Sequence, residues 1–447
     1  MRKTLIILSC LVALLNTACT GDSSRPVATG KAGIRAISTN PSAPPIVFLI
    51  EERTLGAIDY ARMTDQSVFD DLEYIFNFEA NFPDELTRRR IASSQLNVER
   101  DFQYTFVVTG DLAAPDVIIW EKPIRDWAGT ETVFEAQFAH TAESLGPVDV
   151  YFADPAIAPA AGEEIGTLAF GEILPVADYE SADYVYTFTT AGNPADVLFK
   201  SIAFTPAPLG GFMITMFDAT ANETGPFAVR VMTNDGTSSA LVGENVTSTV
   251  RFIHASATVG NTDTYTDELL ADQIVANQAF RDITGDIDIA GGLYTFTYTP
   301  PGNPGSILVE ESAVLSGASH NQMYLIGDVA LPSAFIRVPD RRSVETFAKF
   351  TFVHTAVNHP FVDVYVVDPG TALEDANPTF FRLSPGVVPT PVNLAARDVE
   401  IYLTVSTEKT IIAGPIATTT ELGDVLEYIS YDNVDPATAD IELIPLP

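Results

Sequence analysis

The chain has 447 residues, and its 59 acidic and 24 basic side chains give a formal net charge of −35 at pH 7. So large a negative charge argues against nucleic acid and anionic lipid headgroups as partners, because both carry the same sign. The length suggests about three or four domains. Hydrophobic residues make up 46% of the chain, which is enough to build several apolar cores.

The first residues have the features of a secretory signal. Arg2 and Lys3 precede a mostly apolar run from Leu5 to Leu15. A positive start, a short apolar segment and small residues before a cleavage point are typical of such a signal. The apolar run is too short to span a bilayer. We therefore expect residues 1–18 to be a signal peptide that is removed from the mature protein.

Cys19 follows the small residue Ala18 and resembles the cysteine of a bacterial lipobox. The resemblance implies that Cys19 becomes the mature N-terminus and carries acyl chains, so that the membrane is a partner through this anchor. Asn16 stands where a lipobox usually has Leu. Thr20 follows Cys19, and by resemblance to other bacterial lipoproteins this favours the outer membrane, in a periplasmic or surface-facing orientation. The alternative is ordinary cleavage after Ala18, which would give a secreted protein.

The chain has two cysteines, Cys10 and Cys19, and Cys10 lies within the predicted signal. The mature protein is therefore expected to have no internal disulfide and no metal site built from several cysteines. Its stability must come from apolar cores. Residues 19–33 are rich in Ser, Gly and Thr and are expected to form a flexible tether behind the anchor.

Three segments of the chain share one motif. In each, a strand-like run ends in His, an Asp follows nine residues later, and a Tyr follows eleven residues after the His. Three matches at one internal spacing indicate repeated structural units. The residues of this motif are His140, Asp149 and Tyr151; His254, Asp263 and Tyr265; and His354, Asp363 and Tyr365.

Two further motifs follow the first in each unit. The second is an aromatic run that ends in a turn, and the third is an apolar run that ends in Asp. Together the motifs predict three β domains, at residues 132–247, 248–346 and 347–447. The second motif occupies 186–194, 294–304 and, more loosely, 402–409, and the third occupies 212–218, 323–328 and 425–432.

A weaker copy of the unit precedes these three at residues 34–131. Its opening strand resembles the others, but Ser38 replaces the His and Val47 replaces the Asp. Tyr104 is similar to the first residue of the second motif, and the third motif is missing after it. We therefore expect a degenerate β domain that caps the array. The best helical candidate of the chain, residues 83–96, also lies here.

The repeat resembles the bacterial domain-of-unknown-function family 4397, whose unit opens with a strand ending in His and continues through a small-residue turn into an Asp-x-Tyr strand. The resemblance covers most of residues 132–447 and, faintly, 34–128. The segment Arg251 to Ser256 matches the opening best, and Ala257 stands where the family usually has Pro. The resemblance implies a secreted β-sandwich and no known activity.

Apolar and polar residues alternate in the runs that lead to each histidine. Phe134, Ala136, Phe138 and His140 share one face, and Glu135 lies on the other. This period of two predicts strands with one buried face. Units of about 100 residues with many short strands predict an all-β chain of tandem immunoglobulin-like β-sandwich domains. Because the linkers are short, we expect a stubby rod.

The same period places the three repeated histidines on apolar faces, pointing inward. A buried imidazole needs partners for its ring nitrogens. We expect the Asp nine residues on to accept its proton, as Asp263 would from His254, in a structural pair. Catalysis or metal binding is the alternative interpretation. No third polar partner recurs at a fixed spacing, so we expect no catalytic residue, metal or cofactor.

Three weaker groups each have an ordinary interpretation as a turn, a solvated loop or packing at a domain junction. Their alternatives are a metal pair, an acidic cation site and a sugar-stacking platform. The sequence contains no hydrolase nucleophile motif, phosphate loop or zinc-protease motif. The groups are His354 with His359; Asp282, Asp286 and Asp288; and Trp120 with Trp127.

These observations favour a non-enzymatic cell-envelope surface lipoprotein with a structural, adhesive or matrix role. The alternative is a ligand-binding surface receptor with a pocket between sheets or domains, and an enzyme is the third hypothesis. The expected partners are envelope, matrix or glycan components, and not nucleic acid. Since each carries all three motifs, fragments 248–346 and 347–447 are expected to fold independently.

Overall fold

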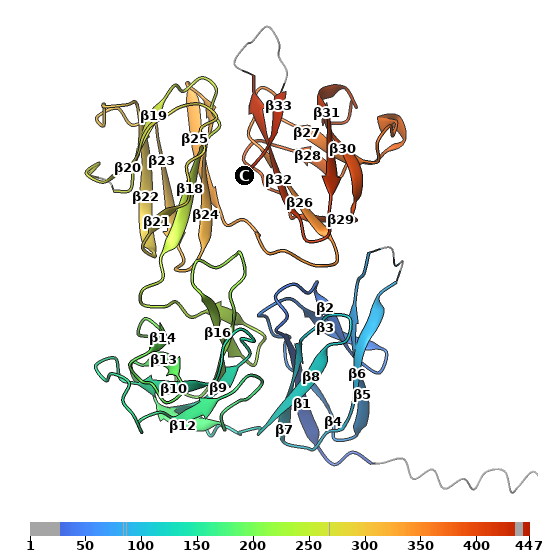
Figure 1. The fold of residues 1–447 in the computed structure, drawn as a ribbon, viewed down its shortest axis with the longest axis vertical. Coiled ribbons are helices and arrows are strands. Elements are labelled where there is room, and N and C mark those ends of the chain that lie inside the picture. Colours follow the sequence, from blue (N-terminus) through green and yellow to red (C-terminus); the bar gives the residue numbers. More distant parts are fainter. Residues whose placement is uncertain (1–26, 84, 86, 268, 434–440) are drawn as a thin grey trace, which may run out of the picture.

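The computed structural model describes residues 27–447 except 84, 86, 268 and 434–440, and it consists almost entirely of β-strands (Figure 1). Strands from four successive segments form eight sheets, which pack in pairs as four β-sandwiches. The prediction of an all-β chain of tandem sandwiches is therefore confirmed. The described part holds no helix that is long and apolar enough to cross a membrane.

The third sandwich, domain 3 (residues 248–337), shows the common architecture most simply. One sheet has the order β21-β18-β24-β25 and the other β20-β19-β22-β23. The first strand, β18, runs parallel to β24, and the remaining neighbours are antiparallel. The strands are β18 (Ser248–His254), β19 (Thr262–Tyr265), β20 (Gln273–Gln278), β21 (Ile287–Ile289), β22 (Gly292–Thr299), β23 (Val309–Leu315), β24 (His320–Asp328) and β25 (Leu331–Arg337).

The other three sandwiches repeat this order, and domain 2 adds one edge strand. Domain 1 contains β1 (Lys31–Ser38), β2 (Ile46–Ile50), β3 (Arg53–Ile58), β4 (Ser67–Asp70), β5 (Glu73–Ala80), β6 (Arg89–Asn97), β7 (Phe102–Thr109) and β8 (Asp116–Pro123). Domain 2 contains β9 (Val133–His140), β10 (Val148–Ala153), β11 (Gly166–Leu168), β12 (Ala177–Glu180), β13 (Val185–Thr190), β14 (Val197–Lys200), β15 (Gly211–Asp218), β16 (Phe227–Thr233) and β17 (Ser238–Ala240). Domain 4 contains β26 (Ala348–His354), β27 (Val362–Val367), a 3₁₀ turn η1 (Leu373–Asp375), β28 (Phe380–Leu383), β29 (Val392–Leu394), β30 (Arg397–Val405), β31 (Ile411–Thr420), β32 (Val425–Asp432) and β33 (Ile441–Pro445).

Domain 1 has the full topology of its neighbours, so the expectation of a copy that lacks its last motif is wrong. Tyr104 lies in β7, which pairs in parallel with β1 and so occupies the place of the third motif. The place of the second motif belongs to β5. The expected helix at 83–96 is instead largely strand β6, paired antiparallel with β5. The strand β1 also begins at Lys31, inside the expected tether.

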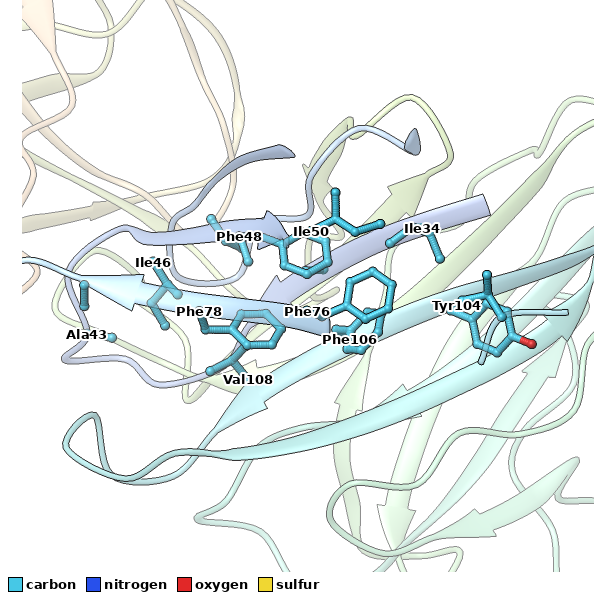
Figure 2. Packing of buried hydrophobic residues seen from close by; sticks show 14 of the residues in the cluster. Ile34, Ala43, Ile46, Phe48, Ile50, Phe76, Phe78, Tyr104, Phe106 and Val108 are labelled. Atoms are coloured by element: carbon cyan, nitrogen blue, oxygen red, sulfur yellow. The ribbon is translucent and has the colours of Figure 1, made fainter. Parts of the chain in front are cut away.

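Aromatic side chains fill the core of domain 1, as alternation in its strands requires. The rings of Phe48 and Phe78 stack with centroids 5.1 Å apart, and those of Phe76 and Phe106 lie 4.4 Å apart. Figure 2 shows these four rings between the two sheets, with Ile46 beside them. Each phenylalanine is completely buried. Full burial of a side chain of this kind stabilises a fold by roughly 1.5–3 kcal/mol.

The first strand of every sandwich is buried on both faces, and this contradicts the expectation of one buried face. In β18, Phe252 faces the core of domain 3, while its neighbour Ile253 belongs to a separate buried cluster on the outer side of the sheet. Val353 of β26 belongs to that same outer cluster. The outer faces of the two sheets are therefore packed against each other, and domains 3 and 4 form a pair.

Domains 1 and 2 pair in the same way. Ile37, Val107 and Trp120 of domain 1 share one buried cluster with Met213 and Phe217 of domain 2. The indole nitrogen of Trp120 donates a hydrogen bond across the junction to the carbonyl of Gly171, at 2.9 Å. Trp120 therefore packs at a domain junction, as the ordinary interpretation predicted.

Polar contacts fix the junction between domains 3 and 4. The hydroxyl of Tyr324 lies 3.1 Å from the carboxylate of Glu427 in domain 4, which also pairs with Arg337 of domain 3. The Tyr324 ring stacks on Phe335 with centroids 4.7 Å apart. Tyr324 is completely buried, so its hydroxyl needs such a partner.

The linker between domains 3 and 4 runs between these two domains and the pair formed by domains 1 and 2, and it contacts domain 1 (Figure 1). The guanidinium of Arg342 donates to the carbonyl of Ala43 at 2.8 Å and to the carboxylate of Asp59 at 2.5 Å. The main chain adds a hydrogen bond from Glu345 to the carbonyl of Ser42, at 2.9 Å. The Arg342 side chain is only 7% exposed, whereas that of Asp59 is 53% exposed, so the ion pair lies at the edge of this junction.

The same linker also joins domains 2, 3 and 4. The carboxylate of Asp340 accepts from Asn222 of domain 2 at 3.1 Å and from Lys349 of domain 4 at 2.6 Å. Next to it, Arg341 pairs with Asp286 of domain 3 at 3.0 Å. The four sandwiches therefore lie two by two around this linker (Figure 1), and the expected rod is wrong.

Tyr324→Ala tests the pairing of domains 3 and 4. In a fragment spanning residues 248–447, we expect the change to lower the free energy of unfolding by roughly 3–5 kcal/mol, the cost of deleting a large buried aromatic ring. Leu293→Ala is the matched control in the same domain, since that side chain is 74% exposed and its loss should cost less than about 0.5 kcal/mol. Equal effects in urea titrations would contradict the pairing.

Candidate functional site

The three repeated histidines lie at the ends of β9, β18 and β26, and all three are completely buried. Each Nε2 approaches a main-chain carbonyl of the following loop: His140 to Gly146 at 3.1 Å, His254 to Gly260 at 2.7 Å, and His354 to the carbonyl of His359 at 2.8 Å. A carbonyl can only accept, so Nε2 carries the proton in each ring. The imidazole therefore holds the loop after the first strand against the core.

The second ring nitrogen is free to accept. In domain 4, Nδ1 of His354 accepts from the hydroxyl of Ser430, at 2.8 Å, on the parallel strand β32. In domain 2, Nδ1 of His140 accepts from the main-chain N–H of Ala142 at 3.3 Å. These partners fit a neutral imidazole with one donor and one acceptor.

Burial keeps these imidazoles neutral, because it disfavours the charged form. Burial lowers the pKa of His354 from 6.5 to about 4, against a smaller opposing effect from its hydrogen bond to the carbonyl of His359. Burial also lowers the pKa of His140 and of His254.

The repeated aspartates occupy a different network, on the second sheet of each domain. The carboxylate of Asp263 accepts from the main-chain N–H of Asn277 in β20 at 2.7 Å and from that of Gly302 in the β22–β23 turn at 2.8 Å. Asp149 makes the same two connections through the hydroxyl of Thr167 and the N–H of Gly192, each at 2.6 Å. The carboxylate thus ties an edge strand and a hairpin turn to the strand between them.

In domain 4, Asp363 has three donors. They are the N–H of Arg382 at 2.7 Å, the hydroxyl of Ser406 at 2.8 Å and the N–H of Thr407 at 3.1 Å. The predicted pairing of histidine with aspartate is therefore wrong in all three repeats. The His donates to a loop carbonyl and the Asp accepts from a turn, so the fixed spacing reflects two separate structural contacts.

The repeated tyrosines lie two residues after these aspartates and share their face. Tyr151, Tyr265 and Tyr365 are at most 6% exposed, although they point away from the core between the sheets. In domain 4, Tyr365 packs with Val367 and Leu373, the latter from the loop that holds η1. A loop folded over the second sheet therefore covers the tyrosine there.

The Asp that ends the third motif makes a further polar contact. Its recurrence is visible in the sequence, but no role was assigned to it there. The carboxylate of Asp218 accepts from the N–H of Glu143 at 2.9 Å, and that of Asp432 accepts from the N–H of Val357 at 2.7 Å. Both donors lie just after the repeated histidine. The recurrence of an Asp at the end of the third motif was the sequence signal that could have identified this contact with the loop after the histidine.

The weaker candidates do not converge into a site. The Nε2 of His354 donates to the main-chain carbonyl of His359, and a nitrogen that carries this proton is not available as a metal ligand. Asp286 pairs with Arg251 at 2.9 Å and with Arg341, so the charge of this member of the acidic group is compensated within the fold. Among the described residues, no three His, Cys, Asp or Glu side chains gather closely enough to hold a metal ion. Trp127 is stacked against the guanidinium of Arg125, 4.2 Å from its ring.

Hollows open at several places on the described surface. One, about 600 Å³, lies where domain 2 meets domain 3 and is lined mainly by small and aliphatic residues, among them Val242, Val246 and Leu315. Another, about 320 Å³, lies at the tip of domain 4 beside Phe361 and Arg382. Both are within the size range of small-molecule sites. Cys19 lies outside the described residues, so its lipidation stays a prediction.

Residues 248–365 match the model of the domain of unknown function 4397 family, and the resemblance drawn from the motifs is confirmed. The match covers domain 3 and continues through β26 into β27 of domain 4. No curated protein matches the chain. Among solved structures, the Bacillus anthracis TIE protein is similar at 8% identity over 90% of this chain and 69% of that chain, with a TM-score of 0.16. So low a score supports no argument about fold or function.

A double-mutant cycle separates the two polar networks of domain 3. We expect His254→Ala and Asp263→Ala each to destabilise the 248–447 fragment by about 1–3 kcal/mol or more, since each leaves buried polar groups unpaired. Because the two side chains share no hydrogen bond among the contacts described above, their coupling should stay below about 0.5 kcal/mol. A larger favourable coupling would restore the direct pair.

Stability should depend on pH through His354. Its folded pKa of about 4 lies below the ordinary 6.5, so the unfolded chain binds a proton in this interval that the folded chain does not. Stability is therefore fully present above about pH 6.5 and falls by up to roughly 3 kcal/mol as the pH drops to 4. Urea titrations of the 248–447 fragment should show a weaker pH dependence for His354→Asn; identical profiles would contradict the assignment.

Proposed function

We propose that this chain, in which residues 248–365 match family 4397, is a non-enzymatic cell-envelope surface lipoprotein with a structural, adhesive or matrix role. The main support is that the repeated polar residues make hydrogen bonds within the fold. His254 holds a loop and Asp263 holds a turn, and both are buried. Asp263 already accepts from two main-chain N–H groups, and burial shields the His254 ring from solvent, so neither side chain is placed to act on a substrate.

The arrangement of the domains supports the same proposal. Asp340, Arg341 and Arg342 tie the four sandwiches together through ion pairs and several hydrogen bonds. Inter-domain interfaces that are large and apolar resist relative motion. A rigid unit of this kind suits a protein that spaces or supports other envelope components, whereas an enzyme that closes on its substrate needs a hinge.

The proposed location rests on the sequence. The signal-like residues 1–18 and the lipobox-like Cys19 would place an acyl chain at the membrane, and β1 begins only at Lys31. The negative charge of the chain disfavours direct contact with anionic headgroups, so the acyl chains are the proposed membrane contact. We propose the outer membrane, in a periplasmic or surface-facing orientation.

Cys19→Ala tests the anchor. We expect the wild type to sediment with membranes and to incorporate labelled palmitate, and the variant to appear in the soluble or culture fraction without label. Cys10→Ala is the matched control, since Cys10 lies within the signal, and it should leave both results unchanged. A Cys19→Ala protein that still sediments with detergent-free membranes would contradict lipidation.

The role is tested separately in cells. A strain without the protein should lose attachment to its matrix or the integrity of its envelope. The wild type should restore this property, whereas the released Cys19→Ala protein should not. Full restoration by the released protein would contradict a structural role at the membrane and would favour a soluble receptor.

The receptor hypothesis has one observation of its own. The hollow of about 600 Å³ between domains 2 and 3 is lined by Val242, Val246 and Leu315, with Glu244 at its side. An apolar hollow with a single charged residue is typical of a small-molecule site. Ala290→Trp would fill this hollow, and loss of a ligand captured from culture medium in that variant alone would favour the receptor.

A further inference from the structure

The tip of domain 4 departs from the repeat at the position just before the Asp-x-Tyr strand. In domain 3, Asn261 lies just before β19. Its side-chain amide donates a hydrogen bond to the side-chain carbonyl of Asn277 at 3.0 Å and so closes the tip of the domain. In domain 4 the equivalent pair is Phe361 and Arg382, with the guanidinium 4.6 Å from the ring centroid. An amide pair in one domain is thus replaced by an aromatic ring and a stacked cation in the next.

The correspondence between these pairs follows from the backbone. Asn277 and Arg382 each donate their N–H to the repeated aspartate, and both have a positive φ, of 50° and 53°. A shared bond and a shared left-handed conformation place the two side chains equivalently. The change at the tip of domain 4 is therefore a change of side chains on an unchanged frame.

The hairpin turn of domain 4 departs from the repeat as well. Its residue bound to the aspartate is Thr407, with φ 71°, where the sister domains have Gly192 and Gly302. A β-branched residue with positive φ is strained, because its Cβ crowds the backbone. Strain of this kind is concentrated at binding sites, where the side chain serves a purpose that glycine cannot.

These changes leave a hollow of about 320 Å³ at the tip of domain 4. Pro360 and Phe361 form an apolar side with Val405, and Arg382 and Thr407 supply polar groups. Its wall is completed by two further residues, and the full lining is His359, Pro360, Phe361, Arg382, Val405, Ser406 and Thr407.

Arg382 brings an uncompensated charge to this hollow. Among the described residues no carboxylate lies within ion-pair distance of its guanidinium, although Arg397 of the same domain pairs with Asp368 at 2.9 Å. The nearby carboxylate of Asp363 accepts from main-chain N–H groups and a hydroxyl instead. In a chain of net charge −35, an unpaired guanidinium beside an apolar wall is available to an external anion.

We propose that this hollow binds a carboxylate carried on a small apolar body, such as a free aromatic acid or the C-terminus of a peptide that ends in an apolar residue. The planar guanidinium of Arg382 offers two parallel N–H donors that match a carboxylate. The Phe361 ring holds the guanidinium beside the apolar wall through a cation–π contact, and Pro360 and Val405 contact the apolar body. Asp363 positions both polar walls through the main chain of Arg382 and Thr407.

Ligand binding at this hollow is independent of the structural role of the chain, because neither the membrane anchor nor the pairing of domains involves these residues. The probes are N-acetylphenylalanine, its uncharged amide and the peptide Gly-Gly-Gly-Phe, titrated into the mature chain by calorimetry and by saturation-transfer NMR. The acid should bind and the amide should bind at least about tenfold more weakly, a difference of about 1.4 kcal/mol. Tighter binding of the peptide would identify a peptide C-terminus as the source, and equal binding a free acid.

The variants assign the binding to Arg382. Arg382→Gln should weaken binding of N-acetylphenylalanine at least about tenfold, as expected for loss of a charge-assisted bidentate contact. Phe361→Ala should also weaken it, and Arg397→Gln is the matched control that should leave it unchanged. Melting temperatures within a few degrees of wild type would show that each variant is folded, and Arg382→Lys replaces Arg382→Gln if the latter is not.

Any one of three differences from these expectations would overturn the proposal, and so would a complete lack of binding. They are equal binding of the acid and the amide, unchanged binding by both Arg382 variants, and an equal loss in Arg397→Gln. Absence of binding by all three probes at millimolar concentration would overturn it as well.

Discussion

The burial of both faces of the first-strand sheet is the constraint on which the arrangement of this protein depends. In each sandwich the inner face of this sheet closes a core, while the outer face packs against the same sheet of another domain. Ile253 and Tyr324 would be exposed on an isolated domain 3, although both are buried in the chain. An exposed apolar patch of this kind favours association. The pairing of domains is therefore part of what makes each sandwich soluble.

The repeated polar motif is a consequence of the sandwich frame. A loop must close over the end of the first strand, and the buried His supplies a donor to its carbonyl; a hairpin turn must meet the next strand, and the Asp accepts its N–H. Because both contacts satisfy the backbone, the side chains around them are free to differ among domains. Asn277 and Arg382 occupy one such position, with amide chemistry in domain 3 and cationic chemistry in domain 4.

The sequence was sufficient for the fold class and the repeat, because alternation and spacing are local properties. It placed His254 inside correctly, since Phe252 and Val250 define that face. It assigned the wrong partner, because Gly260 and Asp263 both follow His254 within nine residues and only the path of the loop decides between them. The outer cluster was missed for a similar reason: Ile253 is flanked by residues of the inner face, and an isolated apolar residue on the outer face does not reveal a second domain. The motifs of domain 1 were assigned to the wrong strands because the aromatic run at Tyr104 resembles the second motif, whereas its strand, β7, occupies the place of the third motif beside β1.

The central claim is that the four domains form one unit held two by two around the linker residues Asp340, Arg341 and Arg342. Small-angle X-ray scattering of residues 27–447 in solution tests it most directly, since a paired arrangement and a linear one differ strongly in maximum dimension. The account predicts a scattering curve that agrees with the compact arrangement of Figure 1. A pair-distance distribution with the long tail of four domains in a row would contradict it.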